Sequence, residues 1–214
     1  MAGSAFQSAA TPEVEPQDSN ELTMKSTDTW YVVDREGRIT AVGGGWDVFA
    51  RTNEAPEIRG QHVVGHLWSD YVDSQEVRDL YDRIFDVVRG RQRPIEFGFR
   101  CDGPASRRKM RMHLSPMPHG AIELRTRTLS EIERASQALP ARSVPRTDEL
   151  LLMCSYCNRI RVPGVGWCEV ERAIATIDLF TAERMPGLGH GICDPCLLQL
   201  RALIDGAERS SSAD

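Results

Sequence analysis

Four of the six cysteines in this 214-residue chain form two Cys-x-x-Cys pairs, Cys154 with Cys157 and Cys193 with Cys196. A Cys-x-x-Cys turn brings two thiolates to one side of the chain, and two such turns can complete a tetrahedron around Zn²⁺. Four protein ligands leave no coordination position for water, so the expected site is structural and holds one Zn²⁺ per chain. The spacing therefore predicts a metal centre made by these four cysteines.

Other chemistry is compatible with the same cysteines. Four thiolates can also ligate an iron–sulfur cluster, and a redox dithiol or a disulfide pairing are further alternatives. His190 lies three residues before the second pair, and Cys168 lies between the pairs. We expect His190 to support the site from outside the ligand set, with either residue as an alternative ligand.

The segments around these cysteines indicate a small zinc-ribbon or treble-clef-like module. After Cys157, the sequence predicts a strand over 159–162, a Pro-Gly turn over 163–166 and a returning strand over 167–170. A helix is expected over 171–180. A second helix is expected to begin at Cys193, because Asp194 and Pro195 suit a first helical turn. So small a module has too little core to fold confidently without a metal.

The region before the module predicts a mixed α+β fold. Two strands, 29–33 and 38–42, precede short helical pieces over 46–58. The apolar stripe over 74–89 predicts an amphipathic helix that Asp73 caps and Gly90 ends. Alternating apolar residues then predict strands over 95–101, 110–114 and 122–125. This order gives a five-stranded antiparallel sheet with helices on one face.

Residues 29–128 resemble a PAS domain, a small sensor module. The resemblance is carried by the opening hairpin Val33–Ile39 and the central segment Val64–Val72. It implies a curved sheet around a pocket that holds an unknown ligand or only side chains, and it implies pairing into a homodimer. The residues expected to form this pocket or core are Trp46, Phe49, Tyr81, Phe97, Phe99, Cys101 and Met112.

The cysteine segment resembles a second known family. Met153–Arg161, Trp167 and His190–Leu197 are similar to a C-terminal module of bacterial PAS and response-regulator proteins. This resemblance covers residues 151–200 and implies no particular activity. Cys168, directly after the tryptophan, and the turn Pro163–Gly166 depart from the family pattern.

Composition is typical of a soluble globular chain. Residues 1–28 are too polar to bury a core and are expected to be a disordered arm, and residues 206–214 a disordered tail. The expected PAS-like domain (29–128) is followed by a helix and linker (129–149) and the cysteine module (150–205). Neither a secretory signal nor a membrane span is expected, which favours the cytoplasm.

Eight bases fall within 23 residues: Arg89, Arg91, Arg93, Arg100, Arg107, Arg108, Lys109 and Arg111. The net charge of −5 nevertheless argues against nucleic-acid binding, as does the strand pattern that points Phe97 and Phe99 into the core. His62 and His66 lie in a polar loop, which argues against haem. The sequence carries no Asn-Cys-Arg motif for a light-sensing flavin.

The expected function is non-enzymatic signalling, because no phosphate-binding loop or hydrolase motif occurs. In this hypothesis the PAS-like domain senses or dimerises, and the zinc module contacts a protein partner. A redox or metal sensor, with the four cysteines as the switch, is the first alternative. A nucleic-acid-binding zinc protein is the second.

Overall fold

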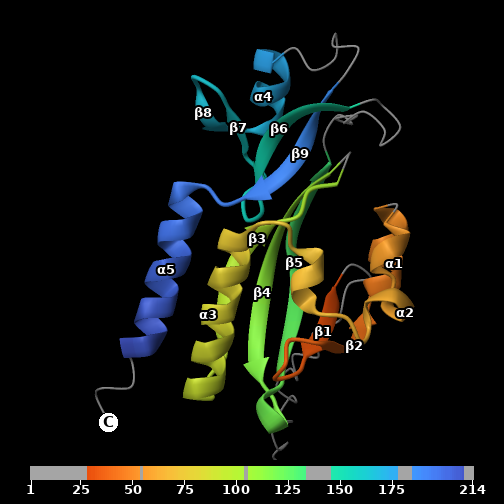
Figure 1. Ribbon diagram of the computed structural model, residues 1–214, viewed down its shortest axis with the longest axis vertical. Coiled ribbons are helices and arrows are strands. Elements are labelled where there is room, and N and C mark those ends of the chain that lie inside the picture. The colour runs from red at the N-terminus through yellow and green to blue at the C-terminus, as the bar shows by residue number, and fades with distance from the viewer. Residues whose placement is uncertain (1–27, 54, 104–105, 134–145, 178–184, 210–214) are drawn as a thin grey trace, which may run out of the picture.

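The structure is a computed structural model and describes residues 28–53, 55–103, 106–133, 146–177 and 185–209. It contains two sheets of different size, with helices packed beside them (Figure 1). Residues 1–27 of the predicted arm, most of the predicted linker and the last residues of the tail lie outside the described residues.

The first sheet is the five-stranded antiparallel sheet that the sequence predicts, with strand order β2-β1-β5-β4-β3. Most buried positions of β3, β4 and β5 are apolar, with Arg108, Thr126 and Thr128 as buried polar exceptions. Glu96, Arg111 and Arg127 face solvent on the opposite side. The mixed α+β fold class is therefore confirmed. The strands are β1 (Thr29–Val33), β2 (Ile39–Gly44), β3 (Ile95–Arg100), β4 (Ser106–Pro116) and β5 (Ile122–Glu133).

Helices separate β2 from β3, and the longest, α3 (Gln75–Arg91), packs against β4 and β5. Its cap is Ser74 and not Asp73, because the Ser74 hydroxyl accepts a hydrogen bond from the Val77 N–H at 3.4 Å. The helix runs through Gly90 and ends where Gln92 adopts a left-handed conformation. The shorter elements are α1 (Trp46–Thr52), η1 (Pro56–Ile58), α2 (Gly60–Val63), η2 (Trp68–Tyr71) and η3 (Pro118–Gly120).

The second sheet has the order β8-β7-β6-β9 and contains a parallel pair, β6 with β9. The sequence predicts the hairpin β7–β8 and the two helices but misses β6 and β9. Cys154 ends β6 and pairs in register with Gly191, which ends β9. The elements are β6 (Arg146–Cys154), β7 (Ile160–Val162), β8 (Gly166–Cys168), α4 (Val170–Ile177), β9 (Met185–Gly191) and α5 (Asp194–Arg209).

Several predicted boundaries are wrong. Residues 129–133 continue strand β5 where a helix was expected, because β4 is long enough to pair with them. Residues 146–149 belong to β6, and α5 extends to Arg209 into the predicted tail. Asp28, assigned to the arm, is buried, and its carboxylate accepts a hydrogen bond from the Thr128 N–H at 2.9 Å.

The cysteine turns and α5 pack into the core of the first sheet, whereas β7, β8 and α4 form a second apolar cluster of their own. Buried residues of α3 and of β3–β5 form a single cluster with Tyr156 and Ile192 of the cysteine module and with Leu200 and Ile204 of α5. In Figure 1, α5 descends beside α3, so the C-terminal helix covers the first domain. Arg83 on α3 pairs with Asp205 on α5 at 2.8 Å. The cysteine turns and α5 are therefore packed against the first sheet and α3, in addition to the separate cluster of the second sheet.

Gly43 allows a test of how β1 and β2 pack in the first sheet. A methyl group there would overlap the Trp30 ring, which lies on the neighbouring strand. We expect Gly43→Ala to lower the free energy of unfolding by about 1–3 kcal/mol in denaturant titrations, the usual effect of overpacking. Gly90→Ala is the control: its Cβ meets open space within α3, so it should raise stability by about 0.5–1 kcal/mol. Equal effects of the two substitutions would contradict this packing.

Candidate metal centre

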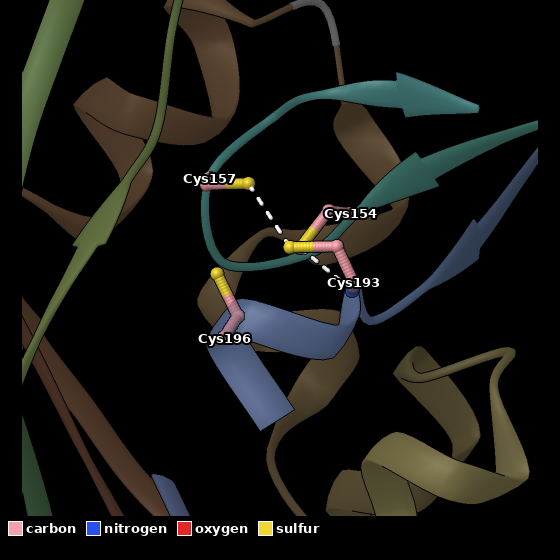
Figure 2. Close-up of side chains that lie close together, drawn as sticks. All are labelled: Cys154, Cys157, Cys193 and Cys196. Carbon is pink, nitrogen blue, oxygen red and sulfur yellow. Dashed lines mark hydrogen bonds between the residues drawn. The ribbon is translucent and has the colours of Figure 1, made fainter. Parts of the chain in front are cut away.

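The four predicted cysteines come together at one point. The Sγ atoms of Cys154, Cys157, Cys193 and Cys196 all lie within 4.8 Å of one another. Figure 2 shows one pair on the turn after β6 and the other at the start of α5. Cys154 and Cys193 have an exposed fraction of 0%, whereas Cys157 and Cys196 are half-buried.

The parallel strands explain how distant segments meet. Because β6 and β9 run side by side and end at the same level, the segments that follow them emerge together. The Ser155 N–H donates to the Gly191 carbonyl at 2.9 Å, which ties the two turns to each other. The first turn is closed by the Asn158 N–H donating to the Cys154 carbonyl at 2.9 Å, with Asn158 in a left-handed conformation.

The surroundings favour negative charge on Cys154. Donation from the Cys157 thiol outweighs burial and lowers the pKa of Cys154 to about 4, with backbone N–H groups acting in the same direction. One of these is the Cys193 N–H, 3.4 Å from Cys154 Sγ. The hydrogen bond to Cys154 is the larger cause that raises the pKa of Cys157, and burial adds to it. Burial is the larger cause for Cys196, and together with the hydrogen bond to Cys193 it raises the pKa of that thiol to about 12. Metal binding would therefore release protons from this site.

The geometry fits a single ion. Zn–S bonds of about 2.3 Å in a tetrahedron place sulfurs roughly 3.8 Å apart. Cys157 Sγ and Cys193 Sγ are 3.6 Å apart, and the largest separation in the set stays within 4.8 Å. In an iron–sulfur cluster, cysteines that bind different irons are held further apart, because the cluster core separates them. The start of α5 beside Cys193 adds the positive end of a helix dipole.

The two companion residues lie outside the thiol group. Cys168 is buried in a second apolar cluster with Ile160 and Val170 and is not among the four clustered thiols. The His190 side chain is half-exposed, and its Nδ1 lies 3.8 Å from an Asp73 carboxylate oxygen. His190 thus reaches from β9 toward the start of α3.

The predicted pocket residues do not share one environment. Phe97 and Met112 are buried in the core, and Trp46, Tyr81 and Phe99 pack partly buried against it. Phe49 lies apart, with the Arg108 guanidinium 5.8 Å from its ring centre. Cys101 is half-buried beyond the end of β3, where burial raises the pKa of its thiol.

Sequence reasoning missed Tyr156, which lies between two of the cysteines. Its exposed fraction is 5%, and its ring stacks on Tyr81 with centroids 6.5 Å apart and contacts Phe97 at 5.7 Å. The Tyr156 carbonyl accepts a hydrogen bond from the Arg100 N–H of β3 at 2.7 Å. A large aromatic residue between the two cysteines of a Cys-x-x-Cys turn could have marked Tyr156 as a packing residue. The spacing alone could not show into which core its ring packs.

Several clustered bases are engaged within the chain. Arg100 pairs with Asp102 and with Glu169, the latter at 2.7 Å. Arg107 reaches Glu171 at 3.2 Å, and the Arg108 Nε–H donates to the Cys101 carbonyl at 2.8 Å. These contacts connect the first sheet to the cysteine module, and they use guanidinium groups that a nucleic-acid face would need.

The two histidines considered for haem do not converge. His62 is exposed, and its Nδ1 lies 2.8 Å from the Pro56 carbonyl oxygen, whereas His66 lies in the segment before η2, where its carbonyl accepts from the Ile39 N–H. Among the described residues, the four cysteines are the group placed to hold a metal ion.

Comparisons with known proteins give little guidance. No family model matches the chain, and no curated protein does. Among solved structures, a domain of an HTR-like protein from Haloarcula marismortui is similar over 48% of this chain and 98% of its own, with 15% identity and a TM-score of 0.36. At these values the function has to be argued from the site itself. Within the described residues, none of the helices has the length and apolar character needed to cross a bilayer.

The ligand set predicts different effects for two cysteines. Cys157→Ser removes one thiolate from the cluster, so we expect bound metal, measured by elemental mass spectrometry, to fall at least about tenfold after dialysis against a weak chelator. Cys168→Ser is the matched control and should keep about one ion per chain, because Cys168 lies in a separate core. Equal metal loss in both variants would contradict the assignment.

Proposed function

We propose that this protein is a non-enzymatic bacterial signalling protein in which a PAS-like sensor domain and a structural Zn²⁺ centre act as one unit. The observation that carries the proposal is the position of Tyr156. It belongs to the turn that supplies Cys154 and Cys157, yet its ring lies among the aromatic side chains of the sensor sheet and α3.

Zinc is the ion that best suits the centre. The four sulfurs fit one tetrahedral ion, two of them are fully buried, and the complete ligand set leaves no position for a substrate. Such a site contributes folding free energy and not hydrolysis, which agrees with a protein that signals without catalysis. When bound, the ion would fix the turn over 154–157 and with it the depth at which Tyr156 enters the core.

Contacts around Tyr156 supply the coupling. Through the Arg100 N–H, the turn is bonded to edge strand β3, and through the ring it touches Tyr81 on α3. Glu169, near the end of the β7–β8 hairpin, accepts hydrogen bonds from both Arg100 and Arg159. A shift in the sensor core therefore changes the surroundings of the zinc ligands, and loss of zinc changes the sensor core.

Hydrogen exchange read by mass spectrometry tests this coupling. Removing zinc from the whole protein with a chelator should lower protection in β3 and in the part of α3 around Tyr81, in addition to the cysteine segments. Tyr156→Ala should lower protection in the same two elements while zinc stays bound, because the four thiols remain.

The matched control is Tyr156→Phe. It keeps the ring and its contacts with Tyr81 and Phe97, so protection should stay close to the level of the unmodified protein. If zinc removal changes exchange only within residues 146–209, the coupling does not exist and the centre stabilises only its own segment.

The proposal includes an output through a protein partner, pairing into a homodimer through the sensor domain, and a cytoplasmic location. Deleting the cysteine module is a poor test of its partner role, since α5 and Tyr156 belong to the sensor core. Nucleic acid has no part in the proposal, because Arg100, Arg107 and Arg108 are bonded to groups of the same chain.

A redox sensor is the second candidate, and the half-exposure of Cys157 and Cys196 favours it. Hydrogen peroxide would take two electrons from two thiolates, forming one S–S bond and two hydroxide ions as their bonds to zinc break. We expect one equivalent of peroxide to release zinc, followed with a coloured chelator, and a thiol reductant to restore binding. Cys168→Ser should behave identically, and zinc that stays bound at excess peroxide would leave a purely structural site.

A further inference from the structure

A groove on the sensor domain lies apart from the four cysteines. Its volume is about 360 Å³, within the range of small-molecule sites, and its walls are α3, the turn between β1 and β2, and η2. Three arginines line it, Arg35 from the turn and Arg78 and Arg89 from α3. Their charges outnumber those of the two carboxylates that also line it, Glu36 and Asp82.

Two of the guanidinium groups are held in place by neutral acceptors. The Arg78 Nε–H donates to the Val72 carbonyl at 2.5 Å. Arg89 donates to the Gly120 and Asp34 carbonyls, each at 2.9 Å, and lies over the Phe85 ring at 5.6 Å. Bonds to carbonyl oxygens orient a guanidinium without cancelling its charge, so both cations are preorganised. The Arg35 guanidinium is exposed and makes no hydrogen bond or ion pair with the described residues.

An indole donor completes the groove. Trp68 has an exposed fraction of 7%, and its Nε1–H has no acceptor among the described residues, whereas the Trp46 Nε1–H donates to the Ile58 carbonyl at 2.7 Å. Gly37 stands directly over this donor: a Cβ there would lie 3.5 Å from Trp68 Nε1. Gly37 has a φ of +85°, a conformation that favours glycine and keeps the space above the indole open.

We propose that this groove binds a small organic anion through Arg35, Arg78, Arg89 and the Trp68 indole N–H. A carboxylate or a phosphate group meets the same requirement, because both accept hydrogen bonds from a guanidinium fork and from an indole N–H. Asp82 stands on the same wall as an acceptor, so a ligand with a hydroxyl or amine beside its anionic group is favoured. This inference does not depend on the zinc centre or on its coupling to the sensor core.

The test follows the four tryptophan indole N–H signals of the ¹⁵N-labelled, zinc-loaded protein by NMR. Inorganic phosphate and succinate are titrated separately at pH 7, each against sodium chloride at matched ionic strength. We expect one anion or both to shift the Trp68 signal saturably, and the stronger of the two identifies the headgroup. Trp68→Phe assigns the signal, and Phe variants of the other three tryptophans assign it by elimination if that variant does not fold.

Arg35→Gln should weaken the binding about tenfold without changing the melting temperature, because this side chain contributes charge and no internal hydrogen bond. Lys109→Gln removes one positive charge from an exposed position of β4 outside the groove and should leave binding unchanged. The proposal is overturned if neither anion moves the Trp68 signal more than chloride does. It is equally overturned if both charge variants weaken binding to the same extent.

Discussion

The contact on which most of this structure depends is the insertion of Tyr156 between the two sheets. A turn whose cysteines face a metal centre carries, between them, an aromatic ring that belongs to the opposite core. The Tyr156 ring fills space in the core of the first sheet, and the Tyr156 backbone carbonyl pairs with the edge strand β3. Removal of the turn would therefore leave both an apolar cavity and an unpaired strand edge, and each would lower the stability of this part of the first sheet.

Polar contacts reinforce this arrangement along the same boundary. Glu169 is bonded to arginines from both sheets, and despite partial burial their donation lowers its pKa. Solvent-facing pairs such as Arg83 with Asp205 contribute little individually, about 0–1 kcal/mol each. The network around Arg100 is different, because Arg100 and Asp102 are largely buried and the loss of one charge costs more there than at the surface. Apolar burial thus supplies most of the stability, and the ion pairs fix how the two sheets meet.

Local pattern predicted much of the fold and of the site. Alternation gave five strands of the first sheet, the apolar stripe gave α3, and the two Cys-x-x-Cys pairs identified the thiol cluster. Strands β6 and β9 escaped prediction for physical reasons. Leu150–Leu152 suit a helix or a strand equally, and Met185–Gly191 holds three glycines and no β-branched residue. These two strands form because they pair with each other, which a local pattern does not show. The packing of α5 and the cysteine turns on the first sheet was not predicted for a similar reason, because periodicity shows which face is apolar but not what covers it.

The parallel pairing of β6 with β9 has a consequence for synthesis of the chain. A parallel pair needs a long crossover, so the second half of the thiol cluster leaves the ribosome well after the first. Leu200 and Ile204, which complete the core of the first sheet and α3, emerge later still. The apolar side chains that α5 covers therefore stay exposed until this helix has been made, and a ribosome that stalls before that point displays them. Cellular proteases can recognise such exposed apolar side chains, so the docking of α5 protects the core from them.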